Sequence, residues 1–310
     1  MKKVKDFKEG DRLEVNLLVT SLVRGITNTG SPYLTLTLQD SSKSIDAKLW
    51  DVKPEIEKEL QTGKVFTFTI EINTYRNNLQ GKIISVLPVD QNSLDLTEYI
   101  VASPIPKDDL RDLINESVKT ISNKNLQMLV TSLLKHYDDA FYEYPAASKI
   151  HHNFYRGLAT HTYGMVKLAD CVSKIYSSID RDYLISGAII HDLGKIEEIT
   201  SPFVSEYTTK GKLLGHISIL DSVLYEVGND LKLLDSEELL ILRHMVLSHH
   251  GELEFGSPVR PKTLEAEVLS FIDNLDAKIN IIDKALADVK EGEFSSKVFS
   301  LDDRTFYKHK

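Results

Sequence analysis

The first 90 residues alternate between apolar and polar side chains. In the segment 32–40, leucines occupy every second position, and polar or aromatic side chains stand between them. The segments 44–50 and 65–72 repeat this period, and stretches rich in Gly, Asn and Ser separate them. Such alternation predicts antiparallel hairpins. About five short strands in so short a region predict a small closed barrel, with a short helix at 54–60 between the third and fourth strands.

From residue 107 to the end, apolar residues recur instead at spacings of three and four, which is the period of amphipathic helices. Residues 91–106 contain prolines and little periodicity, so we interpret them as a linker. The chain is therefore predicted to be multidomain, with an all-β barrel over residues 1–90 and an all-α bundle over residues 107–310. The helices are expected at 109–121, 125–137, 161–176, 182–190, 218–229, 236–248 and 263–286.

Composition narrows the classes of protein to consider. The chain has 310 residues and a formal net charge of −9, which excludes the overall basic character of many nucleic-acid binders. Residues 1–90 hold 13 Lys and Arg against 12 Asp and Glu, so a net charge of −10 falls on residues 91–310. This excess of acidic residues in the second part of the chain suits a metal site, although the solubility of the surface explains it equally well. The single cysteine, the lack of an apolar run of ~18 residues and the lack of a secretory leader predict a cytoplasmic protein without a membrane partner.

Seven histidine and aspartate side chains stand in predicted apolar helices, six of them at or near a helix end and one, Asp273, within a helix. A buried charged or half-charged group is costly unless it is paired or coordinates a metal, so we expect these residues to share metal ions. Taken singly, each has an ordinary alternative, such as a hydrogen-bonded core histidine, and Asp276 could replace Asp273 as a ligand or hydrogen-bond partner. The seven residues are His161, His191, Asp192, His216, His249, His250 and Asp273.

The order H…HD…H…HH…D, with "HDLGK" at 191–195, resembles the HD-domain phosphohydrolase superfamily. The resemblance implies an all-α HD-domain bundle with two metal ions. It implies that His161, His191, Asp192 and Asp273 hold one ion, and that His216, His249 and His250 hold the other, with Asp192 bridging. Imidazole and carboxylate ligands without thiolate suit Mn²⁺, Fe²⁺ or Co²⁺. Two such ions lower the pKa of a bound water and neutralise charge on a phosphate, which is the chemistry of phosphoester hydrolysis.

Three basic residues near the ligands are candidates for phosphate contacts. Gly194 is expected to end a helix and leave Lys195 pointing at substrate phosphate, so Asp192 and Lys195 are the expected catalytic residues. The alternative for Lys195 is a helix C-terminal cation favoured by the dipole. His152 and Arg156 precede the first ligand, and they either contact phosphates or form a solvated helix start.

The polar face of the predicted barrel carries a candidate nucleic-acid surface. Tyr33 and Trp50 stand on neighbouring strands beside Lys48, which is the composition of a base-stacking platform with a phosphate contact. The next hairpin adds Tyr75 and Arg76 at the rim. The alternative for Trp50 is packing against the linker or the helical domain.

The segment 31–51 resembles nucleic-acid-binding OB-folds of the tRNA-anticodon type. An OB-fold followed by an HD domain resembles the YhaM family of 3′–5′ exoribonucleases from Gram-positive bacteria. That resemblance implies Mn²⁺-dependent release of nucleoside 5′-monophosphates from single-stranded RNA, and also from single-stranded DNA in some members. The rival interpretations are a nucleotide or cyclic-nucleotide phosphohydrolase with a regulatory OB module, and a non-enzymatic single-strand binder. Apolar residues in the tail 295–310 could dock on the chain's own surface or on a second subunit of a homo-oligomer.

Overall fold

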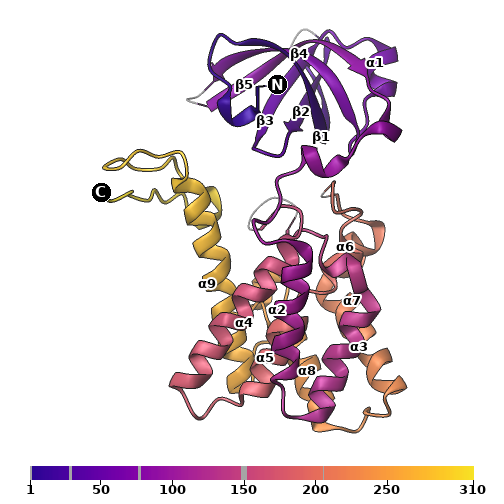
Figure 1. The fold of residues 1–310 in the computed structure, drawn as a ribbon, viewed down its shortest axis with the longest axis vertical. Coiled ribbons are helices and arrows are strands. Elements are labelled where there is room, and N and C mark those ends of the chain that lie inside the picture. The colour runs from indigo at the N-terminus through magenta and orange to yellow at the C-terminus, as the bar shows by residue number, and fades with distance from the viewer. Residues whose placement is uncertain (1, 28–29, 76–77, 148–151, 205) are drawn as a thin grey trace. The chain divides into compact units, whose positions relative to one another are not determined.

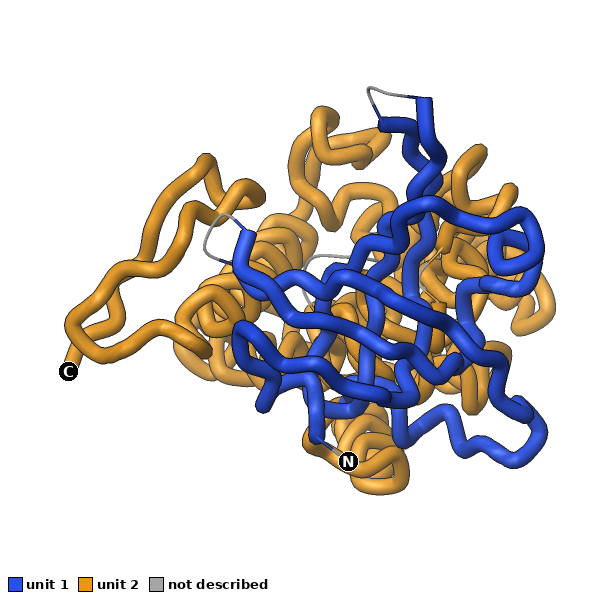
Figure 2. The backbone as a smooth tube through the Cα atoms, turned by 90° about the horizontal axis from the view of Figure 1, so that it is seen from above, with its two compact units in different colours: residues 1–102 blue, residues 103–310 orange. Residues whose placement is uncertain are grey.

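The computed structural model describes residues 2–27, 30–75, 78–147, 152–204 and 206–310. The chain divides into two compact units, residues 1–102 and residues 103–310, which Figure 2 shows in blue and orange. The predicted order of an all-β region followed by an all-α region is confirmed (Figure 1).

The first unit is a closed five-stranded barrel in the order β1-β2-β3-β5-β4. The pairing of β3 with β5 is parallel, and the other pairings are antiparallel. This is the Greek-key arrangement of an OB-fold. A short helix lies between the third and fourth strands, as the sequence predicts. The elements are β1 (Arg12–Ile26), β2 (Pro32–Gln39), β3 (Ser44–Trp50), α1 (Pro54–Glu59), β4 (Val65–Tyr75) and β5 (Asn78–Pro88).

The alternating leucines of β2 point into the barrel. Leu34, Leu36 and Leu38 are at most 1% exposed, and the aromatic and aliphatic residues of β4 complete the core. Because side chains alternate between the two faces of a strand, the intervening Tyr33 and Thr35 lie on the outside. The alternation along β2 therefore fixes which of its side chains are available to a ligand.

Part of the segment predicted as a linker packs on the barrel. The side chain of Gln91 accepts a hydrogen bond from the backbone N–H of Val65 at 3.0 Å and donates to its carbonyl at 2.7 Å. Two 3₁₀ turns, η2 (Gln91–Ser93) and η3 (Leu96–Tyr99), follow β5, and the first compact unit ends at Ala102.

The second unit is a bundle whose central helix is α5. All of its residues from Leu184 to Ile190 are buried, and α5 contacts α3, α4, α8 and α9. Asp180, Ser236 and Thr263 begin helices by accepting hydrogen bonds from backbone N–H groups of the first turn. The helices are α2 (Lys107–Lys119), α3 (Lys124–Phe141), α4 (Gly157–Ile175), α5 (Arg181–Ile190), α6 (Lys195–Glu198), α7 (Thr209–Asp230), α8 (Glu237–Ser248) and α9 (Leu264–Leu286).

An arm follows α9 at the C-terminal end of the chain (Figure 1). It is held by backbone pairing of Phe294 with Tyr307 and of Val298 with Arg304. Leu301 is buried, whereas the side chain of Phe299 is 90% exposed. Among the described residues, no helix combines the length and apolar character needed to cross a membrane.

Candidate functional site

The seven histidine and aspartate residues singled out in the sequence lie together in the helical unit. His161 is on α4, His191 and Asp192 directly follow α5, and Asp273 is on α9. His216 lies within α7, directly after the non-helical Gly215, and His249 and His250 follow the last residue of α8. His161, His191 and His249 are fully buried, and Asp192 is only 2% exposed. Five helices thus bring potential ligands from sequence positions more than a hundred residues apart into one place.

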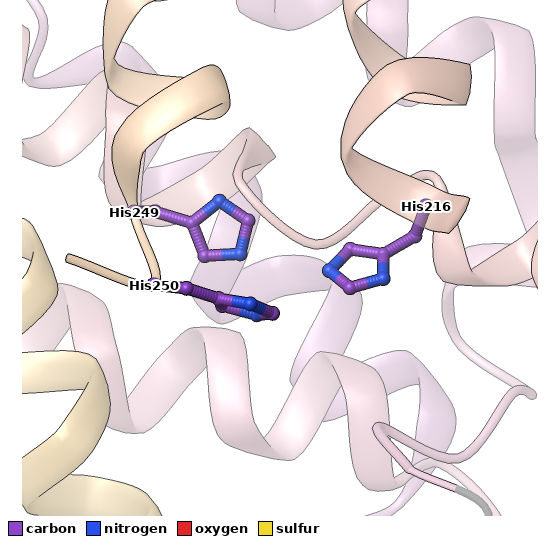
Figure 3. Close-up of side chains that lie close together, drawn as sticks. All are labelled: His216, His249 and His250. Atoms are coloured by element: carbon purple, nitrogen blue, oxygen red, sulfur yellow. The ribbon is translucent and has the colours of Figure 1, made fainter. Parts of the chain in front are cut away.

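The potential ligands form two neighbouring groups. In the first, comprising His161, His191 and Asp273, one atom of each residue lies within 4.8 Å of the others. His161 Nε2 is 3.3 Å from both His191 Nε2 and Asp273 Oδ1. The second group, His216, His249 and His250, meets the same 4.8 Å limit. Figure 3 shows its three imidazole rings gathered together.

Asp192 lies between the two groups. Its Oδ2 is 3.4 Å from His191 Nε2 and 3.7 Å from His161 Nε2, in the first group. Its Oδ1 is 3.6 Å from both His216 Nε2 and His249 Nε2, in the second. One carboxylate therefore presents one oxygen to each group, which is the arrangement that bridging two cations requires.

The second group fits a divalent cation. Among the side chains that the structure describes, Asp192 Oδ1, His216 Nε2 and His249 Nε2 are buried and have no hydrogen-bond partner. Three acceptors facing one another without a shared proton or ion are costly to bury. Nitrogen and oxygen donors at ~2.1 Å from one ion lie roughly 3.0–3.5 Å apart, close to the 3.6 Å separations found here. The donors and their spacing therefore fit a cation with imidazole and carboxylate ligands.

Backbone carbonyls set the tautomers of three histidines. His191 Nδ1 lies 3.0 Å from the carbonyl of Ala188, and His249 Nδ1 lies 2.8 Å from that of Val246. His250 Nδ1 similarly lies 2.7 Å from the carbonyl of Phe255. Because a carbonyl oxygen only accepts, each Nδ1 carries the hydrogen and leaves the Nε2 lone pair for a metal. Two of these partners lie three residues earlier, so a histidine that directly follows a helix is oriented by that helix.

Two acidic residues orient the remaining histidines. Asp276 Oδ2 lies 2.7 Å from His161 Nδ1, and Glu198 Oε1 lies 3.2 Å from His216 Nδ1. Glu198 Oε1 also accepts the backbone N–H of His216 at 3.1 Å. Carboxylates in this position fix the ring of a metal-binding histidine and increase its basicity. Asp276 is among the residues expected from the sequence, whereas Glu198 is not. The available signal was an acidic residue in the same segment as the HD dipeptide, one turn beyond Lys195.

The two groups differ in electrostatics. Burial alone would lower the pKa of His161, yet hydrogen bonds with Asp273 and Asp276 raise it to about 9. Burial lowers the pKa of His250 to about 4, and the neighbouring His249 adds to the effect. The carboxylates around His161 thus make the first group favourable for positive charge. His250 in the second group stays neutral, and the neutral imidazole is the form that binds metal.

Gly194 has a different role from the one expected, and Lys195 pairs with a carboxylate of the candidate ligand set. The helix ends at Ile190, and Gly194 has an ordinary φ of −62°. A Cβ on Gly194 would lie only 2.2 Å from the carbonyl oxygen of His216, so glycine is needed there for close approach rather than for helix termination. Lys195 begins α6, is 8% exposed, and donates from Nζ to Asp192 Oδ2 at 2.6 Å. Lys195 is therefore paired with Asp192, and its contact with a substrate phosphate stays a prediction.

His152 and Arg156 both make contacts within the protein. His152 is 8% exposed and its Nε2 lies 2.8 Å from Asp276 Oδ2. The guanidinium of Arg156 donates to the carbonyl of Ser103 at 2.9 Å and lies over the ring of Tyr155. Their contacts with phosphate remain predictions.

The barrel places three of its five candidate residues together. Tyr33 and Trp50 are cross-strand partners whose ring centroids are 5.0 Å apart. Lys48 Nζ lies 5.4 Å from the first ring and 5.2 Å from the second. Trp50 is 41% exposed, and Tyr75 is exposed at the end of β4. Arg76 lies outside the described residues.

Comparison with known proteins places the candidate metal ligands in one domain. Residues 158–278 match the family model of the HD domain. This range includes all seven candidate ligands, so the helical unit contains an HD domain.

Two examples of solved structures are similar to parts of the chain. The second OB-fold domain of replication protein A from Methanococcus maripaludis is 16% identical, with a TM-score of 0.25, and the match covers 30% of this chain and 98% of that one. A protein assigned as an aspartyl-tRNA synthetase from Leishmania major Friedlin is 12% identical, with a TM-score of 0.21. That match covers 53% of this chain and 39% of the other. Similarity at this level carries no argument about function.

Proposed function

We propose that this protein is a metal-dependent 3′–5′ exoribonuclease, which hydrolyses single-stranded RNA, and also single-stranded DNA, to nucleoside 5′-monophosphates. The observation that carries the proposal is the position of Asp192, whose two carboxylate oxygens face two separate groups of metal-ligating side chains. Two-metal sites of this kind suit in-line displacement at phosphorus. RNA as substrate and attack from the 3′ end rest on the resemblance of nearly the whole chain to the YhaM family.

The residues divide into those that hold the metals and those that act around them. His161, His191 and Asp273 would hold one ion, the three histidines of the second group would hold the other, and Asp192 would contact both. We expect Mn²⁺, with Fe²⁺ or Co²⁺ as alternatives. When bound, the ions supply a water of lowered pKa and neutralise charge on the phosphate.

The chain's own groups prepare the site for this chemistry. Lys195 holds Asp192 in place and puts a positive charge beside the bridging carboxylate. Burial excludes water from His161, His191 and His249 and so strengthens their electrostatic interactions. The proposed role of Lys195 is thus to hold Asp192 and to stabilise the negative charge of the transition state.

The barrel is proposed to bind the single strand away from the reacting end. Tyr33 and Trp50 offer a tilted aromatic pair, and the ammonium of Lys48 lies over both rings. Stacking on such a platform accepts every base, so it suits an enzyme that degrades strands without regard to sequence.

A second candidate is a nucleotide or cyclic-nucleotide phosphohydrolase in which the barrel is regulatory. The observation that favours it is that all seven candidate ligands lie within the helical unit, so the metal centre is complete without the barrel. A non-enzymatic single-strand binder is less consistent with a complete set of ligands.

The test is a time course with a 5′-labelled single-stranded RNA oligomer and Mn²⁺, with and without EDTA, resolved on a sequencing gel. A ladder that shortens from the 3′ end and disappears with EDTA is expected, and the same gel with DNA measures the substrate range. Asp192→Asn, which keeps the shape of the side chain, should abolish the ladder. An uncut oligomer together with rapid turnover of mononucleotides would replace the proposal with the second candidate. Full activity of the Asp192→Asn variant would refute the two-metal mechanism.

A further inference from the structure

One face of α9 carries three polar residues that contact the segment leading to the first metal group. Asp273, Asp276 and Asn280 follow one another at spacings of three and four, so they lie on the same face of the helix. Asp273 contacts His161, Asn280 contacts the backbone of His152, and Asp276 contacts both histidines. Asp276 is therefore the residue where these contacts meet.

The carboxylate of Asp276 bonds two imidazoles with a single oxygen. Its Oδ2 lies 2.7 Å from His161 Nδ1 and 2.8 Å from His152 Nε2. A carboxylate that accepts at Nδ1 keeps the hydrogen on that nitrogen and leaves Nε2 of His161 to face His191 and Asp273. The position of the His161 ring is thus set by a residue that lies outside the ligand set.

The segment before α4 is held against α9 by the same contacts. His152 has a left-handed backbone, with φ of +45°, and its N–H donates to Asn280 Oδ1 at 2.9 Å. Its carbonyl accepts the N–H of Ala146 at 3.1 Å. A strained backbone persists only where surrounding contacts determine it. The bond from His152 Nε2 to Asp276 is therefore one of several contacts that fix this segment beside His161.

The neighbouring helix leaves room for this carboxylate. Gly164 lies on α4, three residues beyond His161, and a Cβ there would come within 2.8 Å of Asp276 Oδ1. Glycine inside a helix is less favourable than alanine. Glycine at position 164 therefore gives up helix propensity and leaves the Asp276 carboxylate in its place beside α4.

We propose that Asp276 is a positioning residue for the first metal group, which fixes the tautomer and orientation of His161 and leaves the second group unaffected. Glu198 holds the corresponding place for His216 in the second group. Replacing each carboxylate in turn therefore tests the proposal, because each replacement should weaken metal binding in one group alone. The proposal rests on the proposed function only in taking these groups as metal sites, and it needs no nuclease activity to be tested.

The experiment measures Mn²⁺ binding to the full chain without substrate, by calorimetry, and the magnetic coupling of the two ions by electron paramagnetic resonance. Asp276→Ala should weaken one of two Mn²⁺ sites by about 10- to 100-fold, the usual effect of losing such a partner. Glu198→Ala should weaken the other site by a similar factor. The double variant should lose affinity at both.

Two gentler variants protect the test against misfolding. Asp276→Asn keeps the shape and one acceptor, so its Mn²⁺ affinity should fall between those of the wild type and Asp276→Ala. Gly164→Ala should also weaken the same site, although alanine favours the helix. Nitrogen-15 spectra of the metal-free wild type at high pH should show that neutral His161 carries its hydrogen on Nδ1. In Asp276→Ala, His161 should no longer prefer this tautomer. Wild-type affinity at both sites in the folded Asp276 variants, or equal weakening of both sites, would overturn the proposal.

Discussion

Replacing Gly194 with alanine tests whether close packing of two segments builds the second metal group. The added Cβ would lie 2.2 Å from the carbonyl oxygen of His216, 3.0 Å from its carbonyl carbon and 3.1 Å from Leu220 Cβ. Since an ordinary contact of a Cβ lies at 3.4 Å or more, the backbone of α7 around His216 must move by about 1 Å. The clash involves backbone, so no side-chain rotation can relieve it.

The size of the effect follows from the geometry. Overpacking a buried site typically costs about 1–3 kcal/mol. The same movement displaces His216 Nε2, which lies 3.6 Å from Asp192 Oδ1. A shift of about 1 Å removes His216 from a site that tolerates only a few tenths of an ångström in its metal–ligand distances. The variant should stay folded, bind one Mn²⁺ with near-normal affinity, and bind the second at least about 10-fold more weakly.

Calorimetry measures the number and affinity of Mn²⁺ ions, and urea denaturation measures the free energy of unfolding. Gly187→Ala is the matched control, because its Cβ would meet the flexible end of Met245 at 2.4 Å in the same bundle. The control should lose stability while retaining both Mn²⁺ ions. If Gly194→Ala binds two Mn²⁺ ions as the wild type does, the inferred link between this packing and the metal group is wrong.

Three further predictions concern the barrel and the metals. Trp50→Ala should weaken binding of a single-stranded oligomer by about 5- to 150-fold, because stacking of a base is worth about 1–3 kcal/mol; fluorescence anisotropy measures this, and Trp50→Phe should retain most of the affinity. Gly25→Ala should weaken the same binding without unfolding the barrel, because its Cβ would lie 2.3 Å from the ring of Tyr33 and displace it; unchanged anisotropy would argue against a role for that ring. Each Mn²⁺ site that is filled at 100 times its Kd should stabilise the helical unit by about 2.7 kcal/mol and so raise the Tm in calorimetric scans by roughly 5–10 °C. An equal Tm in EDTA would contradict a metal site in the folded protein.

The sequence by itself determined the fold class and named the side chains that meet at the candidate metal centre. Strict alternation put Leu34, Leu36 and Leu38 on the inner face of the barrel, because successive residues of a strand point in opposite directions. His191 and Asp192 stood out because they end an apolar helix, where a polar side chain needs a partner. Each of these features lies within a single strand or helix, so the order of residues along the chain is sufficient to find it.

Only the tertiary structure decided how those side chains are held. Glu198 meets His216, and Asp276 meets His161, across loops and helices that no periodic pattern relates. Gly194 looked like a helix terminator, yet its ordinary backbone shows that it makes room for the backbone of α7. The physical reason is that a hydrogen-bond partner or a steric limit depends on the distance between two segments in space, and the spacing of residues along one segment contains no information about that distance.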